Sequence, residues 1–250
     1  MKHNVLFPAG DPMGAAIFDY HKNGAPAGKL VVHSSMFEDD EIPVDGLFRS
    51  FAQMPPLEQA ALRMAEGRIL DVGAGSGCHC LALMDMGKDP VAIDISPLSV
   101  SVMTDKGIDA RLVNLYDDRF KDTFDTVLML MNGSGIIGRL ENMPVFFKKM
   151  KQILAPGGCV LMDSSDLRYL YEDEDGSFEI DLADDYYGLL DYQMEYVPFN
   201  KKASVLGKPF DWLYVDFDTL SYYAEQNGFK AELVAEGEHY DYLAKLTPQS

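Results

Sequence analysis

Short apolar runs alternate with amphipathic stretches through the middle of the chain. The apolar runs have the length of strands, and several are followed by stretches with the 3.6-residue period of a helix. The run at 125–131 is almost unbroken, which is typical of a strand buried on both faces of a parallel sheet. This alternation predicts an α/β fold with a doubly wound parallel sheet. The expected strands are 69–72, 91–93, 110–113, 125–131 and 159–163, and the expected helices are 78–86, 98–106 and 144–154.

The N-terminal quarter of the chain does not follow this alternation. Its apolar positions fit either helices packed on the sheet or a lid over a ligand, built from the same helices. We therefore expect an N-terminal helical segment at 1–62, a candidate lid, followed by an α/β domain at 63–250. The expected elements of the first segment are helices at 11–20, 45–54 and 57–65 and a brief strand at 29–33.

An acidic insertion at 164–217 follows the fifth expected strand. Between Asp163 and Asp191 the chain has eleven Asp or Glu residues and a single Arg, Arg168. Such a run is usually a solvated loop, but its position at the carboxyl edge of the sheet also allows it to shape a pocket for a cationic substrate. We expect its two strands to form an inserted hairpin. The strands are 192–197 and 212–217; a helix capped by Asp218, 219–227, and a strand pair, 230–235 and 242–246, then end the chain.

Composition narrows the classes of partner and location. The net charge of −19 disfavours nucleic acid and anionic membrane surfaces, since both normally require a basic face. No run of about 18 apolar residues and no secretory signal is present, so we expect a cytoplasmic protein. Cys78, Cys80 and Cys159 cannot all pair, which fits reduced thiols. Cys78 and Cys80 point in different directions on a helix, so we expect no metal site.

A turn rich in glycine follows the first expected strand. In Gly73-Ala74-Gly75-Ser76-Gly77 every second residue lacks a side chain, so the backbone can approach a ligand closely. Asp94 ends the neighbouring strand, where a carboxylate can accept hydrogen bonds from both hydroxyls of a ribose. The third glycine comes one residue too early for the dinucleotide fingerprint, and no Gly-Lys-Ser/Thr of a P-loop follows. The pattern therefore predicts a ligand that contains a nucleoside.

The segment Leu70-Asp71-Val72-Gly73-Ala74-Gly75-Ser76-Gly77 resembles motif I of the class I S-adenosylmethionine-dependent methyltransferases. Further similarities to this family follow in the expected order, at 92–96, 124–128, 154–158 and 227–229. The resemblance implies a Rossmann-like sheet of seven strands, with the last strand antiparallel and inserted beside the sixth. It also implies S-adenosylmethionine as the cofactor.

Carried over position by position, the resemblance implies a set of cofactor-binding residues. Gly73 and Gly75 would face the amino-acid part of the cofactor, Asp94 its ribose and Ile95 its adenine. Asn114 stands where the family often has an acid, a departure from the pattern. Arg49 is a candidate partner for the cofactor carboxylate, or else a solvated helix arginine. The full set is Asp71, Gly73, Ala74, Gly75, Asp94, Ile95, Asn114, Leu115, Met131, Asn132 and Arg49.

The sequence says less about the acceptor, the molecule that receives the methyl group. Methyl transfer from a sulfonium is an in-line displacement that needs positioning more than a strong base. His239, at the turn between the last two strands, and Asn132 are weak candidates for catalytic side chains, because a histidine in such a turn is usually only an exposed turn residue. Asn132 is followed by Gly133-Ser134, not by the Pro-Pro-Tyr/Phe typical of enzymes that methylate amino groups of bases and glutamine. This leaves a small-molecule acceptor, with a protein side chain as the alternative.

Two other functional classes compete with the methyltransferase hypothesis. A non-catalytic module could bind S-adenosylmethionine or another nucleoside without an acceptor site. An NAD-linked oxidoreductase would share the strand, the glycine turn and the ribose-binding acid, but the early third glycine at Gly77 disfavours it.

Overall fold

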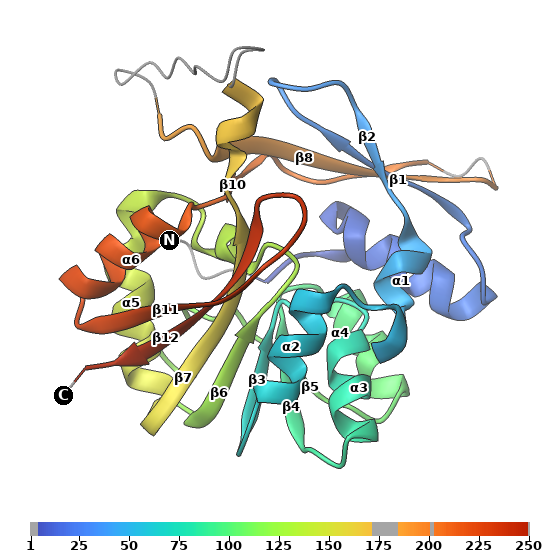
Figure 1. Cartoon of the computed structure of the whole chain (residues 1–250). Coiled ribbons are helices and arrows are strands. Elements are labelled where there is room, and N and C mark those ends of the chain that lie inside the picture. The colour runs from blue at the N-terminus through green and yellow to red at the C-terminus, as the bar shows by residue number, and fades with distance from the viewer. Residues whose placement is uncertain (1–4, 172–184, 201–202, 250) are drawn as a thin grey trace.

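A seven-stranded sheet forms the larger part of the fold (Figure 1). The computed structural model describes residues 5–171, 185–200 and 203–249. Strands β3 to β7 pair in parallel, and β12 lies antiparallel between β7 and β11 in the order β11-β12-β7-β6-β3-β4-β5. The expected α/β class and mostly parallel sheet are confirmed. The strands are β3 Ile69–Val72, β4 Pro90–Asp94, β5 Asp109–Leu112, β6 Phe124–Met129, β7 Leu154–Ser165, β11 Phe229–Glu236 and β12 Asp241–Pro248.

Helices cover both faces of this sheet and bury its apolar side chains. On one face, Leu62 and Leu83 pack with Leu128 of β6. On the other face, Phe146 and Phe147 share a core with strand residues and α6. Among the described residues, no helix combines the length and the apolar character that crossing a membrane requires. The helices are α2 Pro56–Met64, α3 Cys78–Asp85 and α4 Pro97–Asp105 on the first face, and α5 Met143–Ile153 and α6 Phe217–Gln226 on the second.

A second, antiparallel sheet joins the N-terminal segment to the insertion. Its order is β10-β8-β1-β2, with the short β9 paired to β8. Leu30 of β1 lies opposite Tyr196 of β8, so residues far apart in sequence form one sheet. In Figure 1 this sheet stands beyond the upper ends of β6 and β7. The elements are α1 Pro12–Asn23, β1 Gly28–His33, β2 Asp40–Ile42, β8 Leu189–Pro198, β9 Val205–Leu206 and β10 Phe210–Leu213.

Two local expectations differ from the structure. The expected helix at 45–54 is instead two 3-10 helices, Val44–Phe48 (η2) and Phe51–Gln53 (η3). Ser50 and Gln53 form a capping box at which a new helix, η3, begins. Arg49 and Ser50, between the two helices, are therefore extended. The expected strand at 212–217 ends at Leu213, because Asp216, not Asp218, caps α6 by accepting from the Thr219 N–H.

Candidate functional site

The carboxyl ends of β3 and β6 mark the switch point of the main sheet. From β3 the chain adds β4 and β5 on one side, and it then returns to add β6 and β7 on the other. Ligands of open α/β sheets bind in the crevice at such a point. The glycine turn follows β3, and the 3-10 helix η4 (Gly133–Ile137) comes shortly after β6. A Cβ at Gly73 would lie 3.1 Å from Ile136 Cδ1, so the two turns adjoin.

The three glycines of the turn have different surroundings. All have positive φ: +69° at Gly73, +56° at Gly75 and +79° at Gly77. A Cβ at Gly77 would stand 2.5 Å from Ile108 Cδ1 and 2.9 Å from Met103 Cγ, so Gly77 allows close helix packing. Gly73 is exposed, and a Cβ there would meet only Ile136. The backbone is therefore open to a ligand at Gly73 and closed by protein at Gly77.

Asp94 lies at the end of β4, beside the glycine turn. Its Oδ2 accepts from the Gly75 N–H at 2.9 Å, and its Oδ1 accepts from the Ser96 N–H at 2.8 Å. Burial raises the pKa of Asp94 to about 6, although both backbone N–H groups favour its ionised form. The carboxylate is thus fixed in orientation at the edge of the crevice.

Helix α1 covers the glycine turn from the N-terminal side. Its capping residue Asp11 is fully buried, and it accepts from Ser96 Oγ at 2.5 Å and from the Gly14 N–H at 2.9 Å. The Ile17 side chain is also fully buried, and its Cδ1 is 3.7 Å from the position of a Cβ at Gly75. Figure 1 shows α1 beside the upper part of α4. The N-terminal segment therefore forms one wall above the switch point.

A buried polar network lies behind the glycine turn. Arg49 Nη2 donates to both carboxylate oxygens of Glu58 at 2.5 Å, and His79 Nε2 is 2.8 Å from Glu58 Oε2. Asp71, 3.9 Å from His79 Nδ1, accepts from Cys80 Sγ. Burial opposes ionisation of Glu58, yet His79 and Arg49 hold its pKa below the ordinary value. Burial raises the pKa of Asp71.

Arg49 differs from the sequence-based expectation of a helix arginine. Arg49 caps η2 in an extended conformation, not inside a helix, and Glu58 holds its guanidinium. Arg49 Nε is buried and has no hydrogen-bond partner. Asp71 is 1% exposed, so its carboxylate lies beneath the turn.

Several other predicted residues lie along the same carboxyl edge. Ile95 is 36% exposed and Met131 is 41% exposed, so both offer apolar surface beside the crevice. Asn114 follows β5, and its Oδ1 accepts from the Tyr116 N–H at 2.9 Å. The side chains of Ala74 and Leu115 are buried among core residues.

The turn after β6 depends on residues that the sequence did not single out. Met131 and Asn132 have φ values of +65° and +55°. Asp163, near the end of β7, accepts from the N–H groups of Met131 and Gly133, each at 3.0 Å. Asn132 Oδ1 accepts from Ser165 Oγ at 2.8 Å. The only signal in the sequence was an Asp at the end of the fifth apolar run.

Aromatic side chains of the insertion contact one another and, at Trp212, this turn. The hydroxyls of Tyr192 and Tyr214 are 3.1 Å apart, and a Cβ at Gly135 would overlap the Trp212 ring. Tyr169 stacks on Tyr240, with ring centroids 5.1 Å apart. Burial raises the pKa of Tyr192 and Tyr214, so both phenols are neutral at pH 7.

His239 lies in the exposed turn between β11 and β12. Its backbone N–H donates to Asp241 Oδ1 at 3.0 Å. Asp241 pairs with Ser165 at the end of β7, so this turn belongs to the carboxyl edge of the sheet.

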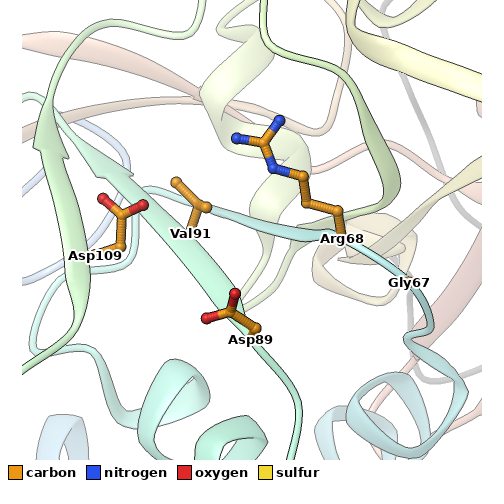
Figure 2. A pocket seen from close by; sticks show the side chains of 5 residues that line it. All are labelled: Gly67, Arg68, Asp89, Val91 and Asp109. Atoms are coloured by element: carbon orange, nitrogen blue, oxygen red, sulfur yellow. The ribbon is translucent and has the colours of Figure 1, made fainter.

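A separate hollow of about 430 Å³ opens at the opposite edge, at the amino ends of β3 to β5. Figure 2 shows the side chains of Arg68, Asp89, Val91 and Asp109 that line it. Arg68 Nη2 is 2.9 Å from Asp122 and is therefore already paired. This hollow lies away from the switch point, the glycine turn and Asp94.

The glycine turn and Asp94 lie together at the switch point, where an α/β protein that binds a nucleoside has its site. A family model described as "Methyltransferase domain" matches residues 70–162. The chain is 62% identical to a SAM-dependent methyltransferase from Bacteroides fragilis, solved in complex with S-adenosyl-L-homocysteine. That comparison covers 100% of both chains, with a TM-score of 0.92.

Two weaker similarities extend the comparison. The CcbJ methyltransferase from Streptomyces caelestis has the same fold, with 14% identity, 98% of this chain and 100% of that chain covered, and a TM-score of 0.64. The cypemycin N-terminal methyltransferase from Streptomyces sp is 32% identical over 110 residues, 42% of this chain and 44% of that protein. The match thus spans less than half the length of this curated relative. The chain belongs to the class I S-adenosylmethionine-dependent methyltransferases, which confirms the resemblance noted at motif I.

Proposed function

We propose that this protein binds S-adenosylmethionine in the switch-point crevice and transfers its methyl group, in line, to a small-molecule acceptor. The observation that carries the proposal is the Bacteroides fragilis relative, which was solved with S-adenosyl-L-homocysteine and is 62% identical over the whole of both chains. The crevice suits this cofactor chemically. Exposed backbone at Gly73 and apolar surface at Met131 suit its methionine part, the Asp94 carboxylate suits its ribose, and apolar surface at Ile95 suits its adenine.

In this proposal Asp94 accepts hydrogen bonds from the ribose hydroxyls, and Ile95 packs on the adenine. Asn114 takes the place of the acid that the family often has near the adenine amino group. Gly46 and Glu58 occupy the Nη atoms of Arg49 and its Nε is buried, so Arg49 reaches the cofactor carboxylate only when its side chain reorients. Gly73 leaves room for the amino-acid part.

The bound cofactor supplies a methyl group on a positively charged sulfur, which is already a strong electrophile. The protein then has to orient the acceptor and exclude water. We propose that the N-terminal segment 1–62 and the insertion 164–217 do so jointly, because strands from both form the second sheet. His239 remains a candidate base on the same edge.

The acceptor side supports a small organic molecule. Trp212 offers aromatic surface against Gly135, and Tyr192 and Tyr214 of the same insertion add a pair of neutral hydroxyls. The net charge of −19 disfavours nucleic acid as the acceptor.

Methylation of a peptide or protein amine is a second candidate function. It is favoured by the likeness to the cypemycin N-terminal methyltransferase, although that likeness covers 42% of this chain. Release of S-adenosyl-L-homocysteine, measured over parallel panels of small amines, phenols and short peptides, separates the two candidates. Turnover with peptides alone would replace the small-molecule proposal, and cofactor binding without any turnover would favour a regulatory module.

Calorimetry with S-adenosyl-L-homocysteine and with NAD tests the cofactor directly. We expect S-adenosyl-L-homocysteine to bind with one site per chain and NAD to give no measurable heat. Binding of NAD without binding of S-adenosyl-L-homocysteine would contradict the proposal and favour an NAD-linked oxidoreductase.

The affinity for S-adenosyl-L-homocysteine should depend on pH through Asp94. Ribose hydroxyls donate to the ionised carboxylate, and burial raises its pKa to about 6 in the free protein. We expect constant affinity above about pH 7 and a loss approaching tenfold per unit below pH 6. For stability the sign is opposite: the folded state binds this proton more tightly than the unfolded chain, so the contribution of Asp94 to stability rises as pH falls through 6. Calorimetry from pH 5 to 8, with Asp94→Asn for comparison, measures the first effect.

A further inference from the structure

The turn after β6 holds two consecutive residues in a strained conformation. Met131 and Asn132 both lie in the left-handed region, with φ values of +65° and +55°. Asn adopts this region more readily than most residues, whereas Met has no such preference. Backbone strain of this kind persists only where the surrounding structure fixes it, and it clusters at functional sites. Some other group must therefore hold the turn in place.

Asp163 is the group that contacts this turn most directly. Its Oδ2 accepts from the Met131 N–H and its Oδ1 from the Gly133 N–H, each at 3.0 Å. Met162 pairs with Met129, the last residue of β6, so the register of the sheet brings Asp163 beside the turn. Asp163 as a whole is 9% exposed, and hydrogen bonds to an ionised acceptor are strong in so buried a position.

The strained turn also lies against the glycine turn. A Cβ at Gly73 would be 3.1 Å from Ile136 Cδ1, and Ile136 belongs to η4, which begins at Gly133. Because Gly133 is one of the two residues held by Asp163, a shift of the strained turn would move Ile136 relative to Gly73.

We propose that Asp163 is a positioning residue for cofactor binding: it holds Met131 and Asn132 left-handed and so fixes the crevice wall opposite the glycine turn. The inference rests on the proposed function, since it assumes that S-adenosylmethionine occupies this crevice. Asp163 acts through the turn and does not itself touch the cofactor.

A double-mutant cycle tests this role with S-adenosyl-L-homocysteine as the probe in calorimetry. Asp163→Asn keeps the shape of the side chain but can accept from only one of the two N–H groups, so we expect affinity to fall tenfold or more. Met131→Gly removes the steric cost of the left-handed turn. The double variant should bind at most threefold more weakly than Met131→Gly alone. This comparison holds whatever effect Met131→Gly has on affinity by itself.

Two further variants keep the test decisive. Asp216→Asn changes another buried carboxylate that accepts a backbone N–H, at the start of α6, and should leave affinity within twofold of the unmodified chain. Ser165→Ala removes only the bond to Asn132 Oδ1 and serves if Asp163→Asn does not fold. We expect it to weaken binding two- to fivefold, and Met131→Gly should suppress that loss as well. Equal losses in both backgrounds, or no loss, would overturn the inference.

A measurement without cofactor separates this inference from the proposed function. In protein labelled with ¹³C at the methionine methyl groups, the Met131 signal is identified by its disappearance in Met131→Gly. We expect Asp163→Asn to shift that signal and Asp216→Asn to leave it unchanged. If the unmodified chain fails to bind S-adenosyl-L-homocysteine, the proposed function fails, and the Met131 signal still tests Asp163. An unshifted signal in Asp163→Asn would refute the positioning role alone.

Discussion

Replacing Asp94 with alanine is expected to weaken the binding of S-adenosyl-L-homocysteine at least a hundredfold. Two ribose hydroxyls would each lose a charge-assisted hydrogen bond, worth on the order of 1.5–3 kcal/mol. A tenfold change in affinity corresponds to about 1.4 kcal/mol, so both bonds together exceed two orders of magnitude. The carboxylate also orders the Gly75 and Ser96 N–H groups at 2.9 and 2.8 Å, and the alanine variant loses this order too. Calorimetry at pH 8, where Asp94 is ionised, gives the comparison.

Asp109→Ala provides the matched control for this prediction. Asp109 is also a carboxylate at a strand end, but it lines the hollow at the opposite edge of the sheet (Figure 2). We expect this variant to bind S-adenosyl-L-homocysteine with unchanged affinity. An unchanged dissociation constant in Asp94→Ala would refute the ribose role, and a loss confined to Asp109→Ala would move the binding site to the amino edge.

Local patterns in the sequence were sufficient to predict the parallel strands of the main sheet, and the family resemblance supplied the antiparallel last strand. The apolar run before Gly73 and the glycines after it encode a strand and a turn within a few residues, with no help from distant contacts. The run at 125–131 likewise requires burial on both faces, and β6 is buried at five of its six positions. Such features depend on the period of the side chains and on glycine φ, which neighbouring residues determine.

Distant pairing was the part that local patterns could not predict. The expected strand at 29–33 and the expected strand at 192–197 both exist, but their pairing, Leu30 opposite Tyr196, joins segments more than 160 positions apart. Nothing local to either segment identifies its partner. The second sheet therefore became visible only in the structure.

The same limit explains which residues of the candidate site could be predicted from the sequence and which could not. Gly73 and Asp94 were predicted because each stands at a strand end in a familiar motif. Asp163 was missed because its role depends on the register of β7 against β6, which brings it next to Met131. Arg49 was placed in a helix because the apolar spacing of 45–54 suits one, but the capping box of Ser50 and Gln53 divides that stretch.

The second large effect is expected when Gly73 and Gly77, four positions apart, are changed to alanine. Gly77→Ala should mainly lose stability, and Gly73→Ala should mainly lose affinity for S-adenosyl-L-homocysteine. In Gly77→Ala the new Cβ would meet Ile108 and Met103 at 2.5 and 2.9 Å, in a backbone with φ of +79°. Left-handed strain of about 1–2 kcal/mol and overpacking of about 1–3 kcal/mol add, so we expect the melting temperature to fall by roughly 5–15 °C. The folded fraction should still bind S-adenosyl-L-homocysteine within about threefold of the unmodified chain.

Gly73→Ala has the opposite balance of effects, because Gly73 is open to the crevice and not to the core. Its Cβ would meet only Ile136, at 3.1 Å, so the stability cost is mainly the left-handed strain at φ of +69°, about 1–2 kcal/mol. The added methyl group would occupy the space proposed for the amino-acid part of the cofactor, and affinity should fall at least tenfold. Thermal melts give the melting temperature of each variant, and calorimetry gives its affinity for S-adenosyl-L-homocysteine. Binding unchanged in Gly73→Ala but lost in folded Gly77→Ala would mean that the cofactor approaches the turn from the α3 side, and the crevice assigned to it would be wrong.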